Sequence, residues 1–163
     1  MTRWYPLVPA DDDFLGTARA VTTKVLDVDV PVETLWEALA ADDAVVSWGP
    51  GATKTRWVGS RPYGVGTVRE VTMGGVATVR EKFYRWDENQ RMTFAVAEST
   101  RPGIRRFAED YVVESTPTGS RLTWTVAVEV AKASGPTAPI VRALLSVAVG
   151  SMTNGLRKRL ERS

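Results

Sequence analysis

The 163-residue sequence contains no cysteine and no histidine. The missing cysteines exclude disulfides, thiolate nucleophiles, zinc–cysteine sites and iron–sulfur clusters. The missing histidines remove the usual general base near neutral pH, the Ser-His-Asp and Cys-His catalytic arrangements, and the commonest protein ligand of metal ions. We therefore expect a protein that works without a metal ion or another cofactor.

The sequence also lacks a large net charge and a long hydrophobic run. The net charge is +2, and the basic residues are scattered apart from Arg157-Lys158-Arg159, whereas nucleic-acid-binding proteins typically show a basic stripe with interleaved aromatics. The longest uncharged stretch, Ala143–Leu156, is shorter than the about 20 apolar residues of a membrane span. Residues 1–13 hold no apolar core of signal-peptide length. We therefore expect a cytoplasmic protein with no nucleic-acid partner and no integral membrane segment.

The composition is that of one globular domain. Hydrophobic residues make up 44% and charged residues 25% of the chain, a balance that argues against disorder. Residues 1–16 include two prolines and Asp11-Asp12-Asp13, and they predict an extended lead-in. No repeat or low-complexity segment suggests a boundary farther on, so we expect a single domain at residues 17–163.

Helical spacing of apolar residues is found near both ends of that domain. After a predicted strand over Thr17–Val30, apolar residues spaced by three and four predict a short helix that begins at Pro31. A second short helix is predicted over Asp42–Trp48, with Asp42 as its N-cap. A long helix is predicted over roughly Pro139–Glu161, introduced by Ser134-Gly135-Pro136.

Between the helices, alternating apolar and polar residues predict six further strands. Their expected ranges are Thr53–Gly59, Gly66–Met73, Val76–Trp86, Arg91–Glu98, Ile104–Glu114 and Ser120–Val130. One face of such a sheet must be covered, and only the C-terminal helix is long enough to cover it. The sequence thus predicts an α+β fold in which a curved seven-stranded antiparallel sheet wraps around the long C-terminal helix, with two short helices between the first two strands.

Several short motifs occur in the order and spacing of a known superfamily. They are Val28–Trp36 at the entry to the first helix, Val46–Pro50, Gly66–Val71, Glu81–Asp87 with Met92–Phe94, and Gly119–Trp124. Over about residues 17–162 the chain resembles the START-related, birch-pollen-allergen-like superfamily (SRPBCC), in its bacterial polyketide cyclase/dehydrase and lipid-transport branch. The resemblance implies a helix-grip fold with a deep apolar cavity between sheet and helix. That cavity would hold a lipid, sterol, polyketide or other hydrophobic small molecule.

Strand alternation and the helical stripe predict which side chains face the cavity. Trp48, just before Gly49-Pro50-Gly51, is expected at its mouth. The complete expected set is Trp48, Arg69, Val71, Met73, Glu81, Phe83, Phe94, Val96, Phe107, Tyr111, Trp124, Val126, Leu145, Ala148 and Met152.

Arg69 and Glu81 are the charged members of this set. A buried charge must be paired or hydrogen-bonded, so we expect the two side chains to meet inside the cavity. They would either bind a ligand oxygen or form an ion pair that only neutralises two inward charges. Glu98, Glu109 and Asp110 also lie on strands, where one carboxylate could face inward and paired carboxylates could serve acid–base chemistry. No spacing singles out a pair, so we expect these three on solvated faces.

Three functions fit these observations. The first is binding or transport of a hydrophobic small molecule by a monomer or homodimer, which the absence of histidine and cysteine favours. The second is a polyketide cyclase or dehydratase, in which Arg69, with phenol or indole donors, would stabilise an enolate. Arg69 and Glu81 are the catalytic candidates in that case, and no catalytic residue is assigned otherwise. The third is a partner-binding module, which would expose a large apolar patch.

Overall fold

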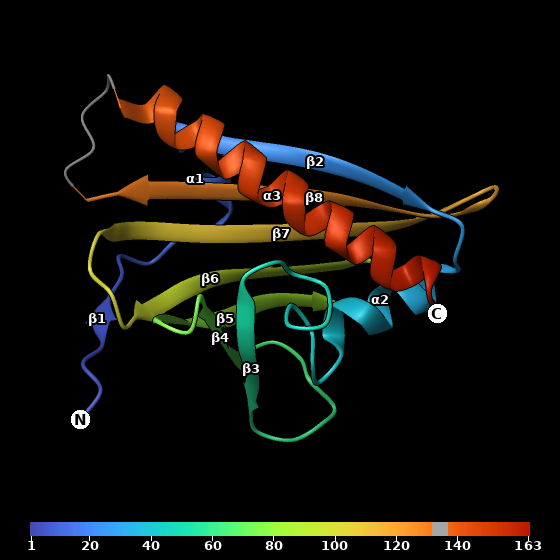
Figure 1. Cartoon of the computed structure of the whole chain (residues 1–163), viewed down its shortest axis with the longest axis horizontal. Coiled ribbons are helices and arrows are strands. Elements are labelled where there is room, and N and C mark those ends of the chain that lie inside the picture. Colours follow the sequence, from blue (N-terminus) through green and yellow to red (C-terminus); the bar gives the residue numbers. More distant parts are fainter. Residues whose placement is uncertain (132–136) are drawn as a thin grey trace.

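The computed structural model describes residues 1–131 and 137–163, and Figure 1 shows the arrangement of its elements. Residues Ser134-Gly135-Pro136, predicted to introduce the last helix, lie outside the described residues. The elements in chain order are β1 (Tyr5–Pro6), α1 (Asp12–Thr17), β2 (Ala20–Val28), α2 (Val32–Ala40), β3 (Ala52–Val58), β4 (Val68–Met73), β5 (Ala77–Asp87), β6 (Arg91–Ser99), β7 (Ile104–Thr116), β8 (Gly119–Val130) and α3 (Ala138–Glu161).

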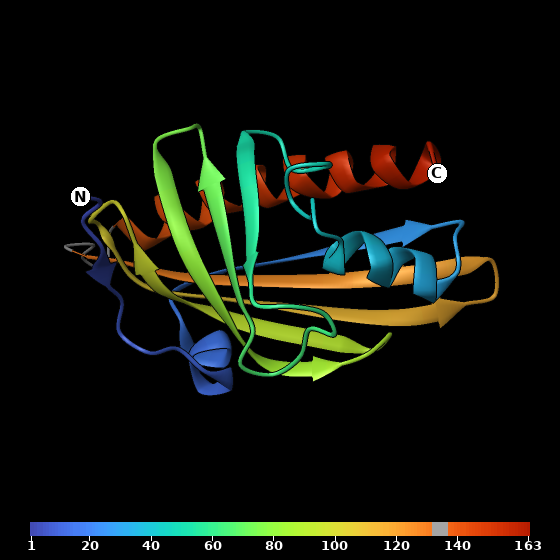
Figure 2. The same ribbon diagram turned by 90° about the horizontal axis from the view of Figure 1, so that it is seen from below.

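The strands form one antiparallel sheet in the order β2-β8-β7-β6-β5-β4-β3. From β3 to β8 each strand pairs with the next one along the chain, while β2 closes the far edge beside β8. α3 runs across one face, and the sheet bends toward it at the β3–β5 side (Figures 1 and 2). The predicted seven-stranded α+β helix-grip fold is confirmed. β1 adds a two-residue pairing to the end of β6.

The predicted lead-in contains a short helix, and the following strand begins at Ala20 instead of Thr17. Asp11 is the N-cap of α1 because its carboxylate accepts the backbone N–H of Phe14, and the two aspartates after it favour a first helical turn. Phe14 is buried against small residues of β7 and β8. The three aspartates therefore start a helix that packs on the side of the sheet opposite α3 (Figure 2).

The segment after α2 folds into consecutive turns, where the sequence pattern predicts a helix over Asp42–Trp48. Val45 has φ +72°, a left-handed conformation that interrupts a right-handed helix. The turns close through the bonds Ala44 N–H to Ala41 O and Ser47 N–H to Asp43 O, at 3.0 and 2.9 Å. The two short N-terminal helices of the structure are thus α1 and α2.

A continuous set of aromatic rings fills the core where α2 and α3 meet the sheet. Trp36 contacts Trp86 edge to face, with ring centroids 5.6 Å apart, and the series continues through Phe83, Phe94 and Tyr111. The C-terminal half of α3 buries its apolar stripe here. Its N-terminal half is less buried, with Ile140, Leu144 and Val147 exposed. None of the helices in the described part of the chain is long and apolar enough to cross a membrane.

Candidate ligand cavity

A cavity of about 340 Å³ lies between the inner face of the sheet and α3. Strands β4 to β8 and one face of α3 line it, together with the connection between β6 and β7. Of the side chains predicted to face it, those that do are Arg69, Val71, Met73, Glu81, Val96, Phe107, Tyr111, Trp124, Val126, Leu145, Ala148 and Met152.

The cavity has an open and a closed end. Arg101, Pro102 and Ala148 line it and are exposed, so they mark its mouth. Tyr111 and Trp124 line it at 1% exposure each, and they mark the closed end. A ligand can therefore enter beside the N-terminal half of α3.

Trp48, Phe83 and Phe94 do not line the cavity, contrary to the prediction. Trp48 lies behind Trp124, with ring centroids 5.8 Å apart, and its indole N–H donates to the Ala38 carbonyl at 3.2 Å. Phe83 and Phe94 are completely buried, because the guanidinium of Arg69 covers them at 5.3 and 5.1 Å from the ring centroids. These three aromatics belong to the core behind the wall.

Arg69 and Glu81 face each other on neighbouring strands and form a buried ion pair. Nε of Arg69 lies 2.6 Å from a Glu81 carboxylate oxygen, and Nη1 donates to the Leu39 carbonyl at 3.5 Å. Burial lowers the pKa of Arg69, but the adjacent carboxylate of Glu81 and weaker contributions from Tyr111 and Glu109 more than offset this, so that the pKa rises. Burial raises the pKa of Glu81, and the guanidinium opposes that rise.

The guanidinium of Arg69 is surrounded by aromatic rings. Its Cζ lies 5.2 Å from the centroid of Trp57 as well as over the two phenylalanines. Nη2 is buried without a hydrogen-bond partner among the described residues, and aromatic faces attract a cation in its place. Arg69 has 0% of its surface exposed, so it touches the cavity only at its edge.

Glu109 is the carboxylate of the wall that the sequence analysis did not include in the expected set. The other wall residues outside that set are Val45, Ala77, Val79, Ser99, Arg101, Pro102, Ile104 and Val149. Glu109 was expected on a solvated face, but it lies on the inner face of β7, lines the cavity and is 9% exposed. The indole N–H of Trp124 donates to its Oε2 at 2.7 Å. Burial, and then the negative charge of Glu81, raise the pKa of Glu109 to about 8. Period-two alternation with Phe107 and Tyr111 is the sequence signal that points to this inward position.

The other two carboxylates of that group lie on the face of the sheet away from the cavity, but Asp110 is buried there, at 8% exposure, and not solvated as expected. Asp110 accepts hydrogen bonds from Arg91 and Thr93 on the far face of the sheet. Glu98 pairs with Arg80, whose Nη1 lies 2.7 Å away. Neither residue lines the cavity.

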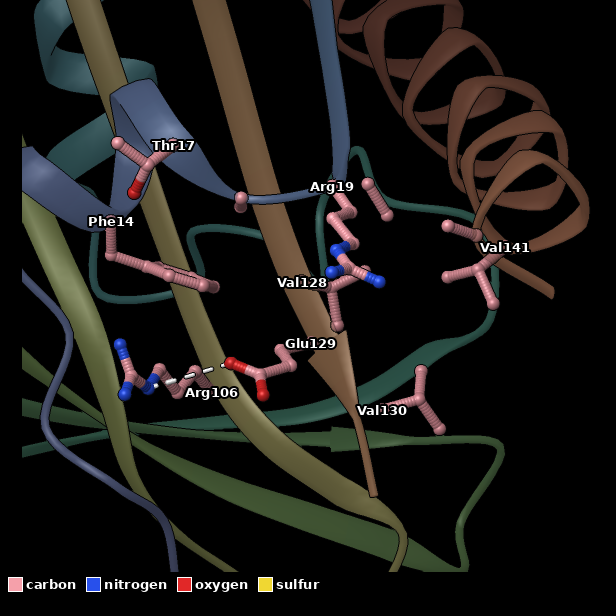
Figure 3. Close-up of a pocket in the computed structure, with 11 residues that line it drawn as sticks. Phe14, Thr17, Arg19, Arg106, Val128, Glu129, Val130 and Val141 are labelled. Carbon is pink, nitrogen blue, oxygen red and sulfur yellow. Dashed lines mark ion pairs between the residues drawn. The ribbon is translucent and has the colours of Figure 1, made fainter. Parts of the chain in front are cut away.

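A second pocket, of about 290 Å³, lies between α1, the ends of β7 and β8, and the start of α3. Figure 3 shows its charged side chains, with Arg106 paired to Glu129 at 3.5 Å and Arg19 beside them. Arg106 also lies over the ring of Phe14, 5.6 Å from its centroid. In this second pocket Arg106 and Glu129 are paired and partly exposed. The pocket offers less apolar wall than the cavity under α3.

Comparison with known proteins places the chain among a large group of relatives. A family model described as polyketide cyclase/dehydrase and lipid transport matches residues 19–161. Uncharacterised proteins of Mycobacterium tuberculosis and Mycobacterium bovis are each 34% identical over 154 residues, which cover 94% of this chain and 92% of the relative.

Solved structures share the fold at low sequence identity. A START superfamily protein from Mycobacterium smegmatis has a TM-score of 0.74 and 16% identity, and the match covers 87% of this chain and 97% of that one. Ara h 8.0201 has a TM-score of 0.68 and 17% identity, with coverage of 88% and 98%. A protein from Thermus thermophilus has a TM-score of 0.69 and 18% identity, with coverage of 88% and 97%.

Proposed function

The chain belongs to the polyketide cyclase/dehydrase and lipid transport family, and we propose that it binds a hydrophobic small molecule in the cavity between its sheet and α3. The observation that carries the proposal is the cavity itself. Its volume of about 340 Å³ falls in the range of about 300–1,000 Å³ that is typical of small-molecule sites. Aliphatic and aromatic side chains make up most of its wall, and such a wall favours an apolar ligand.

The arrangement of the wall supports binding with exchange. The mouth beside Ala148 leads directly to solvent, so a ligand can enter without unfolding of the sheet. Met73 and Met152 lie in the wall, and their flexible thioether side chains can adapt to ligands of different shape. A lipid or polyketide-like molecule of modest size fits these properties.

The experiment is a titration of the purified full chain with N-phenylnaphthylamine, a neutral dye that fluoresces in apolar surroundings. We expect saturable binding at one dye per chain, with quenching of Trp124, whose ring lines the cavity. Trp124→Phe should remove most of the quenching. Native mass spectrometry of the same sample shows whether a ligand co-purifies. Absence of saturable dye binding would contradict the proposal.

A second candidate function is catalysis of the cyclase or dehydratase kind that the family description names. The observation that favours it is Glu109, whose pKa of about 8 allows its carboxyl group to give and take a proton near neutral pH. Arg69 and Glu81 would support such chemistry from the edge of the cavity.

Deuterium exchange tests this second function. If Glu109 removes a proton from the carbon next to a bound carbonyl and then returns a deuteron, acetylnaphthalene in D₂O should gain deuterium at its methyl group. Proton NMR would follow the loss of the methyl signal. Exchange no faster than with Glu109→Gln would leave binding as the function of the cavity.

A further inference from the structure

We propose that Glu109 selects the ligand, by donating a hydrogen bond from its carboxyl group to a neutral oxygen such as that of a ketone, and that carboxylate ligands are rejected. The inference rests on the proposed binding function and assigns the chemical class of the ligand's buried end. It assigns recognition of the ligand's polar group to Glu109 instead of to the Arg69–Glu81 pair.

The first argument is which polar groups a ligand can reach. Arg69 has no exposed surface, and Glu81 already accepts its Nε at 2.6 Å. The indole N–H of Trp124 is occupied by Oε2 of Glu109. Glu109 itself keeps 9% of its surface exposed while it lines the cavity. Tyr111 is 1% exposed, and its hydroxyl also bonds to Glu109. Among the polar side chains at the closed end, Glu109 therefore has the most exposed surface to offer a ligand.

The second argument is the charge around Glu109. Arg69 on β4 and Glu81 on β5 face it and neutralise each other, while Tyr111 and Trp124 on β7 and β8 carry no charge. β6 contributes Val96 and Ser99, and α3 contributes only apolar side chains to the wall. Arg101 lies at the exposed mouth. Among the residues that the structure describes, Glu109 thus has no cation of its own at the closed end of the cavity.

Under these conditions the carboxyl group of Glu109 is mostly protonated at pH 7, in keeping with its pKa of about 8. A protonated carboxyl group has an O–H to donate, and a ketone oxygen can accept it. At the closed end a ligand carboxylate would add a second buried negative charge next to Glu81, where the described residues provide no unpaired cation, and this is strongly unfavourable.

Three naphthalenes of nearly equal size separate these possibilities. They are acetylnaphthalene with a ketone, isopropylnaphthalene with no oxygen, and naphthoate with a carboxylate. Affinities are measured by displacement of N-phenylnaphthylamine at about pH 6 and about pH 9. At about pH 6 we expect the ketone to bind roughly 3–10-fold more tightly than the hydrocarbon, the usual worth of one net hydrogen bond, and naphthoate to bind most weakly.

The pH dependence and two variants assign the effect to Glu109. In the parent protein the ketone preference should disappear at about pH 9, because the ionised carboxylate repels a carbonyl oxygen. Glu109→Gln keeps an N–H donor that does not ionise, so the preference should persist at both pH values. Glu109→Met keeps the length but has no donor, so the preference should vanish at both. Glu114→Gln, at an exposed position of the same strand, is the control and should behave like the parent.

The outcomes also separate this inference from the proposed function. If the three naphthalenes bind but the ketone preference is absent, or survives Glu109→Met, the selection by Glu109 is wrong while the binding function stands. Tight naphthoate binding at about pH 6 would likewise overturn it. If none of the three displaces the dye and the dye itself does not bind, the proposed function fails and this inference fails with it.

Discussion

Arg69 shows how a single charged side chain can be buried without a full set of hydrogen bonds. One edge of its guanidinium binds Glu81 and the Leu39 carbonyl, while three aromatic rings surround Cζ within 5.3 Å. The ion pair offsets the desolvation of both charges, and the rings attract the cation where Nη2 has no acceptor among the described residues. The surroundings of Arg69 are those of a structural ion pair, although it lies at the edge of a cavity.

We predict that removing either charge alone is costly. Arg69→Met or Glu81→Leu should each lower the free energy of unfolding by about 3–5 kcal/mol, because the remaining charge is buried without its partner. The double variant should recover much of this loss, since it buries no lone charge. Urea denaturation followed by tryptophan fluorescence measures all four proteins. Single variants as stable as the parent would contradict a buried pair.

The sequence could indicate the Arg69–Glu81 contact but not the role of Glu109. Arg69 and Glu81 alternate with apolar residues on adjacent strands joined by a tight Gly-Gly turn, which sets the register that brings them together. The same alternation places Glu109 with Phe107 and Tyr111. A lone carboxylate is usually solvated, however, and neither the shielding by α3 nor the indole of Trp124 can be read from β7 alone.

At the scale of elements, the position of α3 depends on a close approach at Gly155. A Cβ added there would lie 1.8 Å from the carbonyl oxygen of Trp48 and 3.2 Å from Pro50. The helix therefore packs directly on the turn segment that follows α2. A Cβ added at Gly150, about 1.4 turns earlier on the same helix, would meet only the end of the Lys24 side chain, at an ordinary contact distance of 3.8 Å.

These two glycines make a matched pair for mutation. Gly155→Ala should destabilise the protein by about 1–3 kcal/mol, because the segment at Trp48 must move away from the new methyl group. Gly150→Ala should stabilise it by roughly 0.5–1 kcal/mol, the usual gain in a helix. Thermal unfolding of both variants checks the opposite signs. Equal gains would mean that α3 does not contact the turn segment at Gly155.

The strands and α3 were predictable because their apolar patterns persist over many residues. The two segments whose structure differs from the prediction each depend on the conformation or capping of a single residue. Val45 takes a left-handed conformation that no propensity indicates for a β-branched side chain, and this converts the predicted Asp42–Trp48 helix into turns. Asp11 acts as a cap for a helix of only six residues, which is too short for a periodic pattern to reveal.

At the scale of the whole molecule, the facing surfaces of α3 and the sheet pack closely along the C-terminal half of the helix and enclose the cavity along its N-terminal half. The C-terminal half of α3 packs on α2 and the aromatic core, whereas its N-terminal half stands over the open wall with Leu145 and Ala148. An interior usually packs without large voids, so a cavity of about 340 Å³ forfeits packing that the protein could have had. Such a loss of packing is expected where a protein uses the empty space to bind a ligand.

This division of α3 allows binding to be blocked without loss of stability. Ala148 is exposed and lines the mouth of the cavity, while Ala143 is also exposed on α3 and does not line it. We expect Ala148→Trp to place its indole across the mouth and weaken N-phenylnaphthylamine binding by about tenfold or more, equivalent to about 1.4 kcal/mol. Ala143→Trp should bind the dye like the parent. Both variants should unfold within about 0.5 kcal/mol of the parent, as exposed substitutions usually do. Equal dye affinity in the two variants would show that ligands do not enter beside Ala148. A loss of stability in Ala148→Trp alone would show that this half of α3 packs more closely on the sheet than its exposure indicates.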